Sequence, residues 1–140
     1  MQAEKISIIG LGLIGGSLAR ALKERLNIKS IAAVDINERS LSQAIKEGYI
    51  SEGFTELCES VYNSDIIFIC TPIKSTIDYI TQLHGKVKDG CILTDTASTK
   101  GEIIDFINSL DNPPCFIGGH PMAGTEKAGF ASSFSHLFEN

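Results

Sequence analysis

The sequence predicts an α/β fold in which one mainly parallel, doubly wound sheet is covered by helices on both faces. Short β-branched, apolar segments alternate with longer amphipathic segments along the whole chain. The short segments are apolar almost throughout, which is typical of parallel strands that are buried on both faces. A glycine-rich turn directly follows the first of these segments, at residues 10–16.

The bulk composition indicates one folded domain. The chain has 140 residues, of which 43% are hydrophobic and 21% charged, so we treat residues 1–140 as a single globular unit. No apolar run approaches the roughly 18 residues that a membrane span requires. Residues 1–15 also lack the basic start and the cleavage site of a signal peptide. We therefore expect a cytoplasmic protein without membrane contact.

Charge and cysteine spacing exclude two further classes. The net charge of −5 and the lack of a basic face argue against a nucleic-acid partner. The cysteines form no C-x-x-C pair, and no histidines stand at metal-ligand spacing, so no metal site is predicted. We expect buried or half-buried thiols in a reducing compartment at Cys58, Cys70, Cys91 and Cys115.

The elements follow in order from the periodicity. Strands are expected where the apolar runs KISIIG, SIAAVD, DIIFIC, CILTD and CFIGG stand, at residues 5–10, 30–35, 65–70, 91–95 and 115–119, with a weaker strand near 49–51. Amphipathic spacing predicts helices near residues 14–26, 38–47, 55–62, 73–83 and 100–110. The Asn112-Pro113-Pro114 run predicts a tight turn before the last strand.

The glycine-rich turn has the spacing of a dinucleotide-binding motif. Gly10-x-Gly12-x-x-Gly15 follows a predicted strand and opens a predicted helix, which is the context that this motif requires. The first glycine would allow the tight turn, the second would let a pyrophosphate approach, and the third would let the helix pack closely on the strand. The helix start, with Leu13 and Ile14, would then present N–H groups and a partial positive charge to the phosphates.

Two other strand ends complete the predicted cofactor site. Asp35 ends the second strand, 20 residues after Gly15, where a carboxylate accepts hydrogen bonds from an adenosine ribose and repels a 2′-phosphate. NAD is therefore favoured, although Arg39 leaves NADP open, and Asp35 could instead serve only as a cap at the strand end. Thr71 and Pro72 follow the third long strand, where they are expected either to start a helix or to contact the ribose or nicotinamide.

Ser98 and His120 are the candidates for chemistry. Thr99 and Glu102 have capping-box spacing, so Ser98 is not needed as a helix cap and could orient a substrate hydroxyl or an imidazole, or be a solvated loop serine. His120 stands between a glycine and a proline at a strand end, where an imidazole can accept a proton. His84 and His136 are expected to have no role in the reaction.

Together these motifs resemble the prephenate dehydrogenases, a family that includes the arogenate dehydrogenases. The resemblance covers GLGLIGGS at residues 10–17, D-x-x-S-x-K-G at 95–101 and, most specifically, GGHPMAGTE at 118–126. It implies NAD-dependent oxidative decarboxylation of prephenate to 4-hydroxyphenylpyruvate in tyrosine biosynthesis. The resemblance assigns the catalytic base to His120 and the orientation of its imidazole to Ser98, and it places Thr125 and Glu126 at the mouth of the substrate pocket.

The resemblance also implies a longer protein. Members of the family continue into a helical domain that dimerises and completes the pocket, whereas this sequence stops at Asn140. We therefore expect residues 1–140 to bind NAD but to turn over little substrate alone, and the full-length protein to be a homodimer. The alternatives are an arogenate dehydrogenase, another NAD-linked oxidoreductase such as a 3-hydroxy acid dehydrogenase, and a nucleotide-sensing module without catalysis.

Overall fold

The computed structural model describes residues 2–139, and within this range all strands belong to one parallel sheet. The strands are β1 (Lys5–Ile9), β2 (Ser30–Val34), β3 (Glu52–Phe54), β4 (Ile66–Ile69), β5 (Ile92–Asp95) and β6 (Cys115–Ile117). The helices are α1 (Leu13–Leu26), α2 (Glu38–Lys46), α3 (Glu59–Tyr62), α4 (Ile73–Leu83) and α5 (Gly101–Asn108), and a 3₁₀ turn, η1, lies at Phe130–Ser132.

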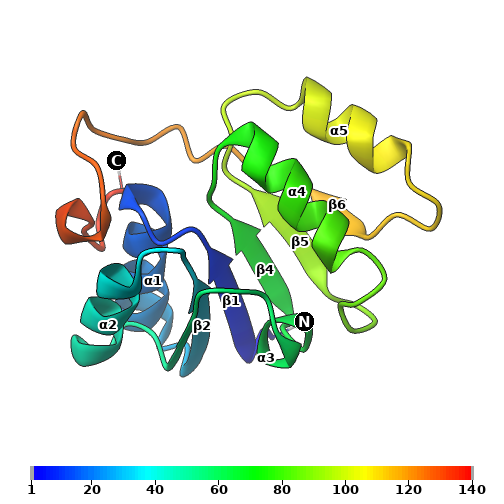
Figure 1. The fold of residues 1–140 in the computed structure, drawn as a ribbon. Coiled ribbons are helices and arrows are strands. Elements are labelled where there is room, and N and C mark those ends of the chain that lie inside the picture. The colour runs from blue at the N-terminus through cyan, green and yellow to red at the C-terminus, as the bar shows by residue number, and fades with distance from the viewer. Residues whose placement is uncertain (1, 140) are drawn as a thin grey trace.

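The strand order is β3-β2-β1-β4-β5-β6, the order of a doubly wound nucleotide-binding sheet. Figure 1 shows α1 and α2 on one face of the sheet and α4 and α5 on the other. The predicted fold class is therefore confirmed. Among residues 2–139, no helix has both the length and the apolar character that crossing a membrane would require.

Each face of the sheet has its own hydrophobic core. The core under α1 and α2 includes Ile8, Ala19, Leu22, Leu41 and Phe130. The core under α4 and α5 includes Ile67, Ile69, Ile80, Leu93 and Ile103. Burying an aliphatic side chain of this size contributes about 1.5–3 kcal/mol. The β-branched strands predicted from the sequence therefore supply apolar side chains to both layers.

The cysteine prediction is correct for three of the four thiols. Cys91 is buried, while Cys58 and Cys70 are half-buried, and burial raises the pKa of Cys70 to about 12 and that of Cys91 to about 11. Cys115 is exposed instead, because it lies on β6, the edge strand of the sheet.

The weak strand predicted near residues 49–51 is displaced. The N–H groups of Tyr49 and Ile50 donate to the carbonyl oxygen of Ala44, at 2.9 and 3.4 Å, and Gly48 has a φ of +81°. These contacts form the turn that ends α2, so the backbone of Tyr49 and Ile50 is hydrogen-bonded to the helix rather than extended as a strand. Regular pairing with β2 therefore begins only at Glu52.

Two helix starts also differ from the prediction. The helix expected near residues 55–62 is reduced to Glu59–Tyr62, because Cys58 has an extended backbone with φ −154° and ψ 175°. Thr71 does not cap α4, since Pro72 occupies the N-cap position. The hydroxyl of Thr71 instead lies 2.9 Å from that of Thr76, one turn into the helix.

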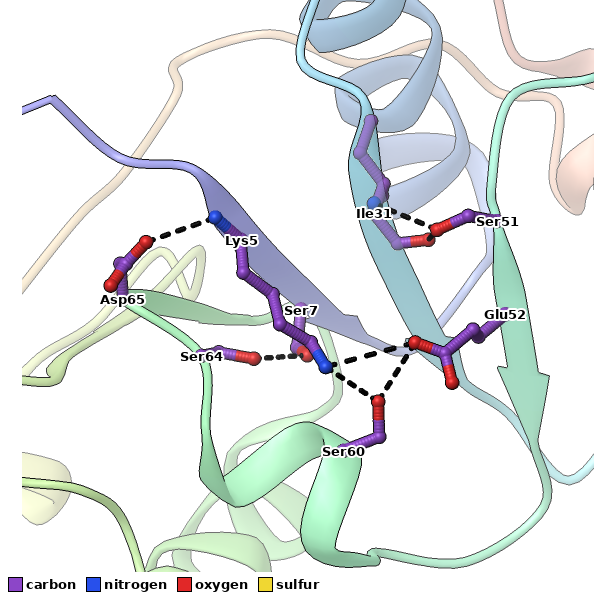
Figure 2. Close-up of polar contacts among 8 residues, drawn as sticks. All are labelled: Lys5, Ser7, Ile31, Ser51, Glu52, Ser60, Ser64 and Asp65. Carbon is purple, nitrogen blue, oxygen red and sulfur yellow. Dashed lines mark hydrogen bonds and ion pairs between the residues drawn. The ribbon is translucent and has the colours of Figure 1, made fainter.

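Polar contacts fasten the strands at the amino end of the sheet, opposite the glycine-rich turn (Figure 2). Asp65 accepts the N–H groups of Glu4 and Lys5, at 2.8 and 2.9 Å, and pairs with the Lys88 ammonium at 2.5 Å. These donors, Lys88 first, lower the pKa of Asp65 to about 2. Beside it the buried hydroxyls of Ser7 and Ser64 are 2.6 Å apart. The amino ends of β1 and β4 are thereby joined.

After β6 the chain returns across the molecule and ends against α1 (Figure 1). Arg20 of α1 holds this return, because its Nε donates to the Ser133 hydroxyl at 2.8 Å and its guanidinium lies 4.6 Å from the centre of the Phe130 ring. A Cβ at Gly16 would come within 2.7 Å of the same ring. Gly16 therefore serves the packing of α1 against η1.

Candidate functional site

The glycine-rich turn has the geometry that the motif predicts. Gly10 has a φ of +91°, and a Cβ there would lie 2.5 Å from the carbonyl oxygen of Cys70. A Cβ on Gly15 would overlap the carbonyl oxygen of Gly10. Around Gly12, in contrast, an added Cβ would meet nothing within 4 Å. The first and third glycines are thus required by the fold, whereas the second borders open space.

The start of α1 offers free hydrogen-bond donors beside that space. Gly12 is the N-cap, has no side chain to cap the helix, and no acidic residue stands in the first turn. Among the described residues, the N–H groups of Gly12, Leu13, Ile14 and Gly15 have no acceptor. Such N–H groups, with the positive end of the helix dipole, form a ready site for phosphate oxygens. The residues present therefore fit a dinucleotide.

Asp35 lies directly beside the glycine-rich turn. One carboxylate oxygen accepts the N–H of Leu11 at 2.6 Å, and the other accepts the N–H of Asn37 at 2.8 Å. The sequence indicated a ligand for a ribose but not this contact, which holds the turn in place from β2. A hollow at this point is lined by Gly10, Val34, Asp35, Ile36, Thr71, Pro72, Ser75 and Tyr79. Burial and, secondly, the charge of Asp35 raise the pKa of Tyr79.

A second hollow lies on the other side of the turn, and we call it the His120 hollow. It has a volume of about 330 Å³ and is lined by Ile14, Leu18, Phe68, Thr94, Asp95, Thr96, Gly119, His120, Pro121 and Phe138. The side chain of His120 lines this hollow and is exposed to solvent. The hollow is otherwise mostly apolar, and one predicted phosphate-site residue, Ile14, shares it with the predicted base.

The structure does not bring every candidate to this hollow. Ser98 is exposed, does not line the hollow, and has no hydrogen bond to His120 within the described part of the chain. Thr125 and Glu126 are exposed as well, and the Thr125 hydroxyl accepts only the N–H of Lys127, at 3.1 Å. The predicted Thr99 cap is wrong, because α5 begins at Gly101 with Lys100 at the N-cap position.

Asp95, at the end of β5, is a site residue whose role the sequence did not reveal. Its side chain is fully buried, and its Oδ2 accepts the Lys100 ammonium at 2.5 Å and the Ala97 N–H at 3.1 Å. Its Oδ1 accepts the N–H of Gly119 at 3.1 Å. A strand-end acid followed by a lysine was visible in the sequence, but the Gly119 contact depends on β6 lying next to β5.

The strand order places the candidates in one row along the carboxyl edge of the sheet. Asp35 follows β2, the glycine turn follows β1, Thr71 follows β4, Ser98 follows β5 and His120 follows β6. Neighbouring strands are about 4.8 Å apart, so the β2 and β6 ends are separated by roughly 19 Å. The row suits an elongated ligand whose phosphates lie near the glycine turn and whose ends reach in opposite directions.

Comparison with known proteins identifies the family. The sequence model of a family described as "Prephenate dehydrogenase, nucleotide-binding domain" matches residues 18–140. The chain is 40% identical to a prephenate dehydrogenase of Lactococcus lactis over 140 residues and 35% identical to one of Bacillus subtilis over 139 residues, each alignment covering 98% of this chain. It covers 39% and 38% of those two proteins, so it spans about two fifths of their length.

A solved structure agrees with the sequence comparisons. The prephenate dehydrogenase from A. aeolicus, crystallised in complex with hydroxyphenyl propionate and NAD+, superposes with a TM-score of 0.88 at 32% identity. The superposition covers 100% of this chain and 49% of that one. The predicted resemblance is confirmed: the chain belongs to the prephenate dehydrogenase family and corresponds to its nucleotide-binding domain.

Proposed function

We propose that this chain is the NAD-binding part of an enzyme that converts prephenate and NAD⁺ into 4-hydroxyphenylpyruvate, carbon dioxide and NADH. The observation that carries the proposal is that free N–H donors at the start of α1 and the imidazole of His120 lie along one edge of the sheet, with Ile14 and His120 lining one hollow. When bound, NAD supplies the nicotinamide that accepts a hydride from the substrate ring.

The cofactor-binding roles follow from the geometry of the turn. Open space at Gly12 admits the pyrophosphate, which the N–H groups of Leu13 and Ile14 bind, while Gly10 and Gly15 allow the turn to close. Asp35 accepts hydrogen bonds from the adenosine ribose. Each carboxylate oxygen has two lone pairs, so Asp35 can hold Leu11 and the ribose at the same time. Thr71 and Pro72 line the same hollow as Asp35.

His120 is proposed as the base of the reaction. It takes the proton of the ring hydroxyl while hydride leaves the carbon that bears it, carbon dioxide departs, and the ring becomes aromatic. Ser98 orients the imidazole, which requires its hydroxyl to reach the ring from its exposed position. Thr125 and Glu126 line the mouth of the substrate pocket. The full-length protein is proposed to be a homodimer through a helical domain beyond these residues.

Formation of NADH from prephenate by the full-length protein, followed by nicotinamide absorbance, tests this proposal. The His120→Asn variant is expected to lose about 10²–10⁴ in turnover, or roughly 3–5 kcal/mol of transition-state stabilisation, with NAD binding unchanged. His84→Asn is the matched control, because His84 ends α4 and its Nε2 lies within hydrogen-bond distance of the Asp111 and Asn112 carbonyl oxygens, at 2.9 and 3.2 Å, away from the candidate site.

Each outcome separates the alternatives. Near-normal turnover in His120→Asn would remove this residue from the mechanism. Turnover of arogenate but not prephenate would change the substrate and keep the assigned roles. A protein that binds NAD but forms no NADH from either compound would be another NAD-linked oxidoreductase or a nucleotide sensor. Sedimentation of the full-length protein and of residues 1–140 tests the proposed dimer.

A further inference from the structure

The loop after β5 and the loop after β6 are joined by a single buried carboxylate. Asp95 is 2% exposed and accepts hydrogen bonds from Ala97 and Lys100 on its own loop and from Gly119 on the other. We call this group of four residues the Asp95 clasp. Ala97 directly precedes Ser98 and Gly119 directly precedes His120. The clasp therefore contacts the main chain one residue before each of the two candidate catalytic side chains.

Close packing leaves the clasp little room to move. A Cβ on Gly119 would lie 2.5 Å from the Asp95 carbonyl oxygen and 3.2 Å from the Thr94 hydroxyl. The methylene stem of Lys100 lies along Gly118, where an added Cβ would be 3.3 Å from Cδ. Both oxygens of Asp95 are occupied, and a charge-assisted hydrogen bond of this kind is about twice as strong as a neutral one.

We propose that Asp95, with Lys100, is a positioning residue that sets the place of His120 relative to Ser98 and the nicotinamide. The positioning role rests on the proposed function, whereas the hydrogen bonds of the clasp are independent of it. We assign no proton transfer to Asp95, because both of its oxygens already accept hydrogen bonds from Ala97, Lys100 and Gly119. A displacement of about 1 Å at a reacting group can cost roughly 10²-fold in rate.

The opposite end of the sheet supplies a matched control. Asp65 also accepts two backbone N–H groups and one lysine ammonium, from Glu4, Lys5 and Lys88, at 2.5–2.9 Å. It therefore has the same kinds of donor as Asp95, but its side chain is 21% exposed and it lies far from the candidate site, at the amino ends of β1 and β4. Asp65→Asn and Lys88→Met thus show the effect of removing an equivalent contact without disturbing the catalytic loops.

The kinetic experiment compares the two carboxylates in the full-length protein. Asparagine replaces one carboxylate oxygen with an amide nitrogen that cannot accept a hydrogen bond, so Asp95→Asn must release at least one partner. We expect kcat to fall 10- to 100-fold while the Kd for NAD changes less than threefold, and Asp65→Asn to change neither by more than about twofold. Lys100→Met, which keeps the stem but removes the ammonium, is expected to lower kcat in the same direction.

Hydrogen exchange of the full-length protein, read by mass spectrometry on peptides covering 96–100 and 118–124, gives a second readout that needs no turnover. Both peptides are expected to exchange at least 10-fold faster in Asp95→Asn and in Lys100→Met, and unchanged in Asp65→Asn. If Asp95→Asn does not fold, Lys100→Met decides the question by both readouts.

The outcomes keep the two proposals apart. A folded Asp95 or Lys100 variant with wild-type exchange and wild-type kcat would overturn the clasp. Faster exchange with unchanged kcat would show a contact that is structural only and would also overturn the positioning role. If the wild-type protein forms no NADH from prephenate or arogenate, the proposed function fails, and the exchange data still support or refute the coupling of the two loops.

Discussion

Substitution by alanine should affect Gly15 mainly through stability and Gly12 mainly through cofactor binding. Gly15 lies inside α1, and a Cβ there would overlap the carbonyl oxygen of Gly10, which is held by β1 and cannot move freely. Overpacking of this kind costs typically 1–3 kcal/mol, and we take the upper end because the opposing atom belongs to the backbone. Alanine gains about 1 kcal/mol of helix propensity, so Gly15→Ala should destabilise the fold by about 2 kcal/mol.

Gly12→Ala should destabilise the fold less than Gly15→Ala does. No atom lies within 4 Å of the added Cβ, but the backbone of Gly12, with φ −88° and ψ −148°, lies outside the regions that alanine favours. Alanine is also a poorer N-cap than glycine by about 0.5–1 kcal/mol, so we expect a total cost of about 1 kcal/mol. The main effect is on the cofactor, because the methyl group would occupy the space proposed for the pyrophosphate. NAD should therefore bind at least about 10-fold more weakly, or roughly 1.4 kcal/mol.

Thermal unfolding and calorimetric NAD titration of the full-length protein and its two variants check both halves of this prediction. At about 2–4 °C per kcal/mol, Gly15→Ala should lower Tm by about 4–8 °C, while Gly12→Ala should lower it by only about 2–4 °C. An unchanged Kd for NAD in Gly12→Ala would show that the phosphates do not pass this residue. An unchanged Tm in Gly15→Ala would refute the packing argument.

Two further predictions concern carboxylates. Asp35→Ser should weaken the binding of NAD and shift the preference toward NADP, because the charge that repels a 2′-phosphate is removed. It should also loosen the turn at Leu11, whose N–H the carboxylate accepts. An unchanged ratio of the two Kd values in direct titrations would contradict the assignment. Asp65 has its pKa lowered from the usual 3.8 to about 2, so its contribution to stability is complete above pH 3.8 and is lost as the pH falls toward 2. Urea unfolding between pH 2 and 6 should therefore show the wild type losing its advantage over Asp65→Asn across this window, and parallel curves would refute the linkage.

Local signals in the sequence were sufficient to predict the geometry of the glycine-rich turn. The glycine spacing, the positive φ at Gly10 and the close approach at Gly15 all depend on neighbours within one strand-turn-helix unit. Asp35 could be placed from its distance along the chain alone. Two predictions failed because a competing hydrogen bond formed with a residue five or six positions earlier in the chain.

Thr99 and the strand near 49–51 illustrate such failures. Thr99 had the right spacing to cap α5, but the helix starts at Gly101. Lys100 occupies the N-cap position, and its ammonium pairs with the buried carboxylate of Asp95. Tyr49 and Ile50 had the composition of a strand, but their N–H groups donate to the carbonyl oxygen of Ala44 at the end of α2. In both cases the expected element was replaced by a competing hydrogen bond to a residue five or six positions earlier in the chain.

The strand order explains why the sequence could nominate candidate site residues but not predict their arrangement. β1 is adjacent to β2 on one side and β4 on the other, so successive crossovers run in opposite directions from the glycine turn. This reversal separates Asp35 from His120 and leaves the start of α1 between them. It also makes β5 and β6 neighbours, which is the condition for Asp95 to contact both the loop that carries Ser98 and the loop that carries His120. The proposed cofactor recognition and the proposed proton transfer therefore use different strand ends, and for this reason Gly12→Ala should impair NAD binding while Asp95→Asn should impair turnover.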